Sequence, residues 1–345
     1  MKQDSGNNSK NIQVAGNMNV GISAMEARQI ALDVFKANFY EFSENAATKA
    51  LLRAEEITDK FIEQFYENIP HLEYRLQEPS IQSTIFNTQK EFAKTGDNDL
   101  MEQLLDLLIQ RIDSEDRSLK QIVLDEAIII LPKLTQDQIN ILSLIFSFVY
   151  FSHERIINHP ALEDLLKNKL LNFYPKEKIS YSFFTHLQFT GCCTLISEGG
   201  KYKPFEQILK SRYKALFIKG FTYEEFKQEF NEDSEKLERL LIKSTHNPNS
   251  FQFNPLNDKV FKSKIQELNL GSIGKKAMAF QEKYLLKDQE IISFLNSKDN
   301  NLEKFRTDWK ESDLKTIRPT SVGLAIAILN YNRVTGENAD IELYL

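Results

Sequence analysis

Residues 23–69 read SAMEARQIALDVFKANFYEFSENAATKALLRAEEITDKFIEQFYENI, and the predicted fold is built on this stretch. Ser23 and Glu26 have the spacing of a capping box, which begins a helix. No glycine or proline interrupts the stretch before Pro70. Its apolar residues recur every three or four positions, as on one face of a helix: Ala31, Phe35, Phe39, Phe42, Ala46, Ala50, Ala54, Ile57, Phe61 and Phe65. We therefore predict one continuous helix over residues 23–69, roughly 65–70 Å long at about 1.5 Å per residue.

The residues before this helix alternate polar and apolar side chains, as half-buried strands do. Two similar pieces, 11–14 and 17–20, flank a turn at Gly16. A two-stranded ribbon is marginally stable alone, so we expect residues 1–22 to form a β arm that pairs with its own domain or with another copy. We prefer self-association, and a frayed terminus is the alternative. The expected contact residues are Ile12, Val14, Met18, Val20 and Ile22.

Composition favours packed helices, because the 345 residues include 25 Phe but only 12 Gly and 9 Pro. The net charge of −6 argues against a nucleic-acid footprint over the whole protein. We predict a mainly α fold with a helical domain over 23–158 and a mainly helical C-terminal domain over 159–345. The seam is placed at Asn158-His159-Pro160.

The C-terminal domain is predicted to contain winged-helix-like β hairpins. A helix over 179–189, a strand over 191–197 and the Gly199-Gly200 turn before Lys201 follow that order. Further along, we expect a loop over 245–257, helices over 259–268, 275–286 and 321–333, and strands over 314–318 and 341–345.

Several features point to the reducing cytoplasm. The two cysteines are adjacent, Cys192 and Cys193, and cannot build a disulfide framework. No apolar signal region follows Met1. The apolar run 139–151 is shorter than the about 20 residues of a membrane span, so it predicts a buried core helix and no constitutive span. A conditional membrane-acting effector stays an alternative, because Ile128–Ile130 lies close by.

No pattern in the sequence indicates catalysis, a metal or a cofactor. His153 and His159 are six residues apart, whereas a zincin helix places two histidines four apart. His71, His186 and His246 lie in unlike segments. We therefore expect a non-enzyme without cofactor or metal, although an active site assembled across the fold stays open, because triads are recognised by geometry.

Basic residues interleaved with aromatic ones suggest a nucleic-acid or oligonucleotide contact in the second half of the chain. The basic candidates are Lys201, Lys203, Lys210, Arg212 and Lys214. The aromatic residues among them belong to a row with helical spacing, which is equally the stripe of a core-facing helix: Phe205, Leu209, Tyr213 and Phe217.

A second candidate phosphate contact is LGSIGKKA, residues 270–277, which resembles a helix-hairpin-helix turn. Its candidate residues are Gly271, Gly274, Lys275 and Lys276. Ser272 replaces the first glycine of that motif. A glycine-capped turn between packed helices is the alternative interpretation.

Four stretches of the chain resemble an uncharacterised bacterial family: NIQVAG at 11–16, IALDVFKANF at 30–39, RAEEIT at 53–58 and TSVGLAIA at 320–327. Members of that family begin with a Gly/Asn-rich N-I-Q-x-x-G arm followed by such a helix. Related arms occur on bacterial conflict and phage-defence proteins. The resemblance implies a defence setting, with a partner protein from a defence operon, and it assigns no catalytic residue.

The leading hypothesis is a non-enzymatic, self-associating bacterial protein that acts as an anti-phage defence effector or sensor. Its arm and long helix would join copies into a homo-oligomer. One alternative is a nucleic-acid or oligonucleotide-binding module in the basic second half, and the other is the conditional membrane-acting effector.

Overall fold

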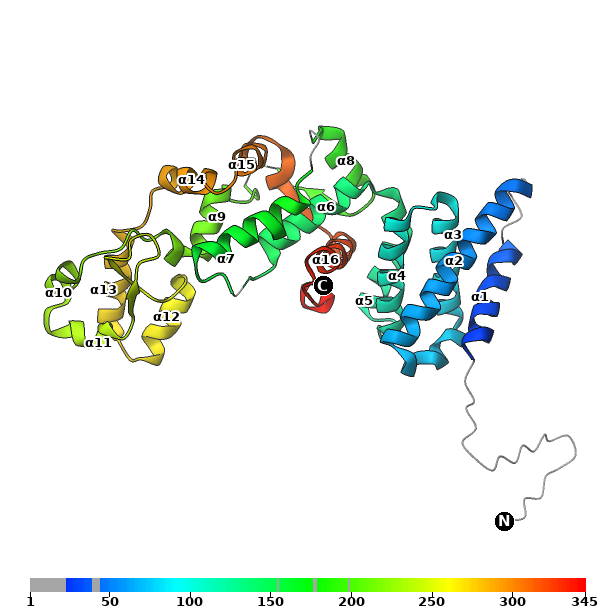
Figure 1. Cartoon of the computed structure of the whole chain (residues 1–345), viewed down its shortest axis with the longest axis horizontal. Coiled ribbons are helices and arrows are strands. Elements are labelled where there is room, and N and C mark those ends of the chain that lie inside the picture. Colours follow the sequence, from blue (N-terminus) through cyan, green and yellow to red (C-terminus); the bar gives the residue numbers. More distant parts are fainter. Residues whose placement is uncertain (1–22, 39–43, 154, 176–178, 198) are drawn as a thin grey trace, which may run out of the picture. The chain divides into compact units, whose positions relative to one another are not determined.

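The fold is mainly α, as predicted. The structure is a computed structural model that describes residues 23–38, 44–153, 155–175, 179–197 and 199–345. It is 73% helical, and its described residues contain two small antiparallel sheets of two strands each (Figure 1). The chain divides into a first unit, Met1–Ile129, and a second unit, Ile130–Leu345.

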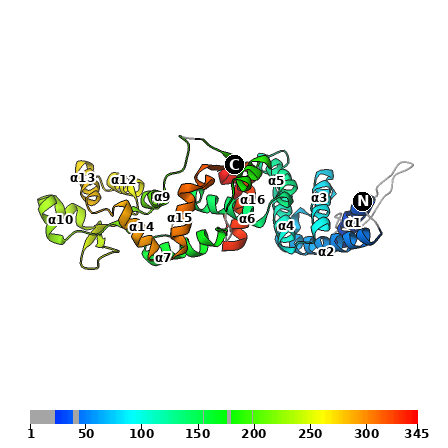
Figure 2. The ribbon, with the colours of Figure 1, turned by 90° about the horizontal axis from the view of Figure 1, so that it is seen from above.

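The first unit is a layer of helices that lie side by side (Figures 1 and 2). Its elements are α1 (Ala24–Asn38), α2 (Glu44–Asn68), a 3₁₀ segment (Pro70–Gln77), α3 (Pro79–Thr95), α4 (Asn98–Asp113) and α5 (Leu119–Ile130). The Asp97 carboxylate caps α4 by accepting hydrogen bonds from the backbone N–H groups of Asp99 and Leu100. Pro70 follows α2 as expected, because proline cannot continue a helix.

The prediction of one continuous helix over residues 23–69 is wrong, because the chain reverses between α1 and α2. Arg28 and Asp59 form an ion pair of 2.6 Å, whereas residues so far apart on one helix would be separated by about 45 Å. Phe35 of α1 packs with Ala50 and Ala54 of α2 and with Ala93 of α3. Within the described residues, most of the apolar row is therefore buried inside the first unit: Ala31, Phe35, Ala50, Ala54, Ile57, Phe61 and Phe65.

The arm residues proposed for assembly lie outside the described residues. They are Ile12, Val14, Met18, Val20 and Ile22. Their role in self-association stays a prediction. Ser23, which follows them, makes the predicted capping box with Glu26: the Glu26 N–H donates to Ser23 Oγ at 3.2 Å, and the Ser23 N–H donates to the Glu26 carboxylate at 2.9 Å.

The second unit is organised around two packed helices, α6 (Gln136–Ile145) and α16 (Ser321–Thr335). Ser143 Oγ donates to the Ala327 carbonyl at 3.0 Å, and Asn330 donates to Ser143 Oγ at 2.8 Å. The predicted core helix over 139–151 is thereby confirmed, and its partner lies in the last part of the chain. Both helices belong to the second unit, which begins at Ile130. The domain seam predicted near residue 158 stays a prediction.

Shorter elements surround this helix pair. In chain order they are a 3₁₀ turn (Leu131–Lys133), a π-helical turn (Phe146–Tyr150), α7 (His159–Asp164), a π-helical turn (Leu165–Leu170), a 3₁₀ turn (Leu171–Phe173), α8 (Tyr181–Phe189), β1 (Cys193–Leu195), α9 (Phe205–Arg212), a 3₁₀ turn (Lys214–Phe217), α14 (Asp288–Asn296), α15 (Asn301–Glu311), a 3₁₀ turn (Asp313–Thr316), β4 (Ile317–Pro319) and a 3₁₀ turn (Ile341–Tyr344). Among the described residues, none of the helices has the length and apolar character needed to cross a membrane.

The predicted winged-helix hairpin is wrong, because β1 pairs with β4 and not with residues after the Gly199-Gly200 turn. The first turn of α16 holds this arrangement in place: the Thr320 N–H donates to the Cys192 carbonyl at 3.0 Å. Gly323 lies so close that a Cβ there would be 1.9 Å from the same oxygen. The strand predicted over 341–345 is also wrong, since these residues form the 3₁₀ turn that Asp340 caps.

Residues 219–286 form an inserted lobe with an aromatic core of its own. Its elements are α10 (Tyr223–Phe230), a 3₁₀ turn (Asn231–Asp233), α11 (Ser234–Glu238), β2 (Leu241–Lys243), β3 (Phe251–Phe253), α12 (Asp258–Glu267) and α13 (Gly271–Glu282). The chain enters and leaves side by side, because Ile218 and Leu285 form a β-bridge. The helices predicted over 259–268 and 275–286 are found as α12 and α13. The loop predicted over 245–257 contains β3, which pairs with β2.

Candidate functional site

Two adjoining hollows meet at Ser152 and His153 of the second unit and together form the His153 cleft. The first hollow, of about 480 Å³, is lined by Ser152, His153, Arg212, Tyr213, Leu256, Asn257, Lys259, Val260 and Ser263. The second, of about 530 Å³, is lined by Phe151, Ser152, His153, Arg155, Ile156, Ala161, Asp164, Lys169 and Glu337. Ligand sites in proteins commonly have volumes of about 300–1,000 Å³.

The cleft lies where α6 ends in a π-helical turn. The Phe151 N–H donates to the Phe146 carbonyl at 2.8 Å, five residues back. Such turns are rare and recur at functional sites. The Phe146 and Phe151 rings pack on Tyr331 of α16 with centroids 5.4 and 5.3 Å away. The core helices therefore hold the segment that carries His153.

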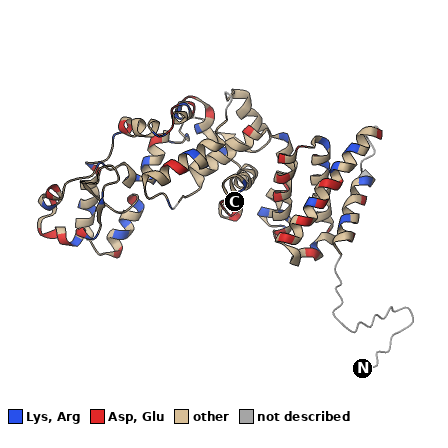
Figure 3. Ribbon diagram, in the orientation of Figure 1, with Lys and Arg blue, Asp and Glu red and all other residues tan. Residues whose placement is uncertain are grey.

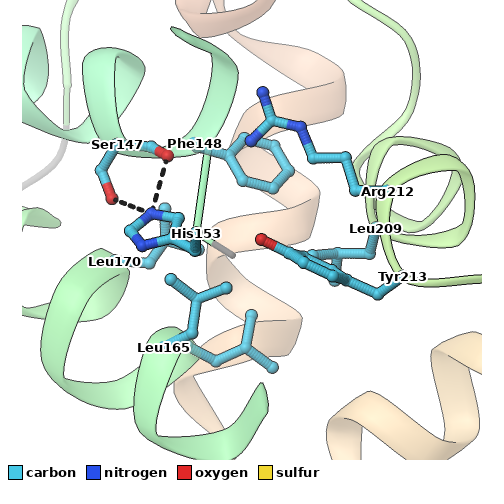
Figure 4. A pocket seen from close by; sticks show the side chains of 9 residues that line it. Ser147, Phe148, His153, Leu165, Leu170, Leu209, Arg212 and Tyr213 are labelled. Carbon is cyan, nitrogen blue, oxygen red and sulfur yellow. Dashed lines mark hydrogen bonds between the residues drawn. The ribbon is translucent and has the colours of Figure 1, made fainter. Parts of the chain in front are cut away.

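His153 is a neutral histidine fixed by Ser147 (Figure 4). Its Nε2 lies 3.2 Å from the Ser147 carbonyl and 3.3 Å from Ser147 Oγ. Because a carbonyl only accepts, Nε2 carries the proton. Only 8% of the residue is exposed, and burial lowers the pKa of His153 from 6.5 to about 4. Lys169 and Arg212 add to this lowering, whereas Glu337 opposes it.

The Ser147 and His153 pair is not arranged as a nucleophile and base. Ser147 Oγ donates its proton to the Lys169 carbonyl at 2.9 Å. Since Nε2 of His153 is itself protonated, it cannot take that proton. The pair therefore holds the end of α6 against the turn that carries Lys169.

Arg212 and Tyr213 form the wall opposite His153. Arg212 donates to the Phe151 carbonyl at 3.1 Å and also to the Val149 carbonyl, and burial lowers its pKa. Figure 4 shows a small pocket on the inner side of these residues, lined also by Ser147, Phe148 and Leu209, in which the Tyr213 hydroxyl points toward His153. Burial raises the pKa of Tyr213 to about 12, so the hydroxyl stays protonated at neutral pH.

The two hollows differ in charge. The first has two cations, Arg212 and Lys259, and no carboxylate among its lining residues. The second contains an ion pair between Lys169 and Glu337, and this pairing lowers the pKa of the Glu337 carboxyl. A net positive charge is therefore concentrated in the first hollow.

The structure does not gather the predicted basic residues into one surface. Carboxylates pair with three of them: Lys210 with Asp288 at 3.0 Å, Lys214 with Asp258 at 2.9 Å and also with Glu282, and Lys276 with Glu229 at 3.3 Å. Basic and acidic residues accordingly alternate over the inserted lobe (Figure 3). Lys201, Lys203 and Lys275 are exposed away from the cleft lining, so Arg212 is the one predicted residue that lines it.

The aromatic row and the glycines of the predicted contacts have packing roles. Phe205, Leu209, Tyr213 and Phe217 are all buried, which confirms the core-stripe interpretation. Gly271 begins α13 with φ of +52°, a conformation that glycine adopts easily. A Cβ on Gly274 would lie 2.5 Å from the Ile265 side chain of α12, so this glycine permits the two helices to pack.

Tertiary structure also brings together two histidines that the sequence keeps far apart. The rings of His159 and His246 lie 4.5 Å apart, and each Nε2 donates to the Leu216 carbonyl, at 2.9 and 2.7 Å. Neither spacing nor motif in the sequence signals this pair. Within the described residues, no group of three or more His, Cys, Asp or Glu side chains is arranged to hold a metal ion. Cys192 and Cys193 are buried, and burial raises the pKa of both thiols.

Comparison with known proteins identifies a family but no characterised relative. One family model matches residues 21–345, so the chain belongs to that family, whose description states no function. No curated protein matches the chain, and no solved structure matches it. A functional proposal therefore depends on the chemistry of the residues described above.

Proposed function

We propose that this family member is a non-enzymatic, self-associating binding protein. Residues 1–22 join copies of the chain, and the second unit holds a ligand in the His153 cleft. The observation that carries the proposal is the first hollow of that cleft, which has two cations, no carboxylate and a volume of about 480 Å³. Concave sites with a few converging polar groups are typical of ligand binding.

The geometry at His153 gives no activated serine. The hydroxyl proton of Ser147 is directed to the Lys169 carbonyl. The imidazole is neutral and donates to the Ser147 carbonyl. A general base needs an unprotonated atom within reach of the proton that it removes, so the protonated Nε2 of His153 cannot activate Ser147.

Self-association is supported by the sequence of the arm and by exposed apolar side chains on α1 and α2. Apolar residues of α1 and α2 are buried against one another within the first unit. They are therefore not available as a contact surface between copies. Met25, close to the arm, is 81% exposed, and Leu52 of α2 is 61% exposed. The resemblance to arms on phage-defence proteins adds a defence setting to this proposal.

The test of assembly is the mass of the protein in solution, measured by light scattering for the full chain and for the chain without residues 1–22. We expect the full chain to have the mass of a homo-oligomer and the shortened chain to have a lower mass. The same mass for both chains would refute the arm's role.

Point substitutions provide a matched comparison for that deletion. Ile12→Asp and Val14→Asp place a charge on the apolar face of the predicted strand, whereas Gln13→Asp places it on the polar face. We expect the first two variants to lower the mass and the third to leave it unchanged. An equal effect of all three would show that the alternation does not define a contact surface.

A further inference from the structure

We infer that the first hollow of the His153 cleft binds a nucleotide-sized organic phosphate. The phosphate lies beside Lys259 and Arg212, and the ring packs against Leu256, Val260 and Tyr213. This inference rests on the proposed binding function and names the class of ligand.

The first step of the inference is the unbalanced charge of the hollow. Lys259 is exposed on the first turn of α12, and it forms no ion pair within the described part of the chain. The preceding residue, Asp258, is paired with Lys214 at 2.9 Å and so is not available to Lys259. An anionic ligand would therefore meet a cation that no protein carboxylate neutralises.

Two other lysines of the second unit, Lys210 and Lys219, do have carboxylate partners. Lys210 is paired with Asp288 at 3.0 Å, and Lys219 is paired with Glu290 at 2.6 Å. These pairs lower the pKa of both carboxyl groups, as expected for stable ion pairs. What sets the hollow apart is that two cations, Arg212 and Lys259, line one concave site without a carboxylate among the lining residues.

The second step is the fixed position of Arg212. Two of its N–H groups donate to the Val149 and Phe151 carbonyls, which hold the guanidinium in place. A guanidinium has five N–H donors, so others remain for a ligand. A planar cation that is already held in position loses little side-chain entropy when it binds a phosphate.

The third step is the apolar part of the lining. Leu256 and Val260 come from the inserted lobe, and Tyr213 comes from the end of α9. Asn257, which also lines the hollow, connects the inserted lobe to α9, because its side chain donates to the Arg212 carbonyl at 3.1 Å. A base-sized ring beside a phosphate would place its apolar faces against these side chains, and His153 adds no charge at neutral pH.

The experiment measures binding of adenosine 5′-monophosphate, inorganic phosphate and adenosine to the full chain by titration calorimetry at low salt. We expect saturable binding of adenosine 5′-monophosphate, weaker binding of inorganic phosphate and weaker binding of adenosine. The Lys259→Gln substitution should weaken the binding of adenosine 5′-monophosphate about tenfold, which is the effect of losing one charge-assisted hydrogen bond. Lys262→Gln is the matched control: it removes an exposed lysine from the same helix, outside the lining of the hollow.

Three results would overturn the inference. The first is that the full chain does not bind adenosine 5′-monophosphate. The second is that adenosine binds as tightly as adenosine 5′-monophosphate. The third is that the Lys259→Gln and Lys262→Gln variants lose the same amount of affinity for adenosine 5′-monophosphate. Tighter binding of a twelve-nucleotide single strand than of the mononucleotide would instead assign the hollow to nucleic acid, and would also overturn it. Because the mass measurement does not depend on any of these probes, failure of the arm and failure of the phosphate assignment are observed separately.

Discussion

Replacement of His153 by glutamine should reduce the acid sensitivity of the second unit. His153 has a pKa of about 4 in the folded protein, compared with an ordinary value of 6.5, because burial disfavours the charged imidazole. Between these two values the unfolded chain binds a proton that the folded chain does not bind. The stability present above pH 6.5 is therefore lost as the pH falls toward 4.

The size of this effect follows from the two pKa values. Lowering the pH from 7.5 to 4.5 should cost the native protein about 2.5 kcal/mol through His153 alone, at about 1.4 kcal/mol for each pH unit. Since glutamine does not titrate, the His153→Gln variant should lose about that much less stability over the same interval. At pH 7.5 the variant is expected to be less stable than the native protein, because the fit around Ser147 is disturbed.

The single tryptophan supplies the assay. Trp309 is 1% exposed, and its ring centroid lies 5.1 Å from that of Phe148, next to the residue that holds His153. Its fluorescence during urea unfolding therefore reports on the second unit. The control is His71→Gln, which replaces an exposed histidine of the first unit and should keep the acid sensitivity of the native protein. Equal losses on acidification in the native protein and in His153→Gln would refute the reasoning.

Three further predictions use the same unfolding measurement or a variant of it. Gly323→Ala should destabilise the second unit by about 1–3 kcal/mol, because the new Cβ would meet the Cys192 carbonyl; an unchanged midpoint would contradict that close approach. Arg212→Met should cost about 1–3 kcal/mol by leaving two backbone carbonyls without a charged donor, and full stability would show that those hydrogen bonds are dispensable. In a double-mutant cycle of Arg28→Ala and Asp59→Ala, with unfolding monitored by circular dichroism, the two substitutions should show a coupling free energy of about 0.2–1 kcal/mol. A coupling of zero is expected if α1 and α2 were one straight helix.

The helical class of the protein and the positions of several helices could be predicted from local patterns. Thr135 and Gln138, three residues apart, form the capping box that begins α6. The run 139–151 is a core element because its apolar residues leave no polar face. These features depend on residues that are neighbours along the chain.

The errors concern partners that are distant along the chain. Helical periodicity in residues 23–69 shows which faces are apolar, but the same period continues whether the chain runs straight or folds back. A glycine turn after β1 favours a local hairpin, yet the strand that pairs with β1 is 317–319. A local pattern holds no information about which remote segment covers it.

The candidate site shows the same division between sequence and tertiary structure. The sequence by itself determined that apolar residues with helical spacing precede His153 and surround Arg212, because composition and spacing set which side chains can leave water together. Only the tertiary structure decided that these two residues share a cleft with Lys259 of the inserted lobe. The physical reason is that burial is a property of each side chain, whereas a binding site depends on the distances between elements that the packed core sets.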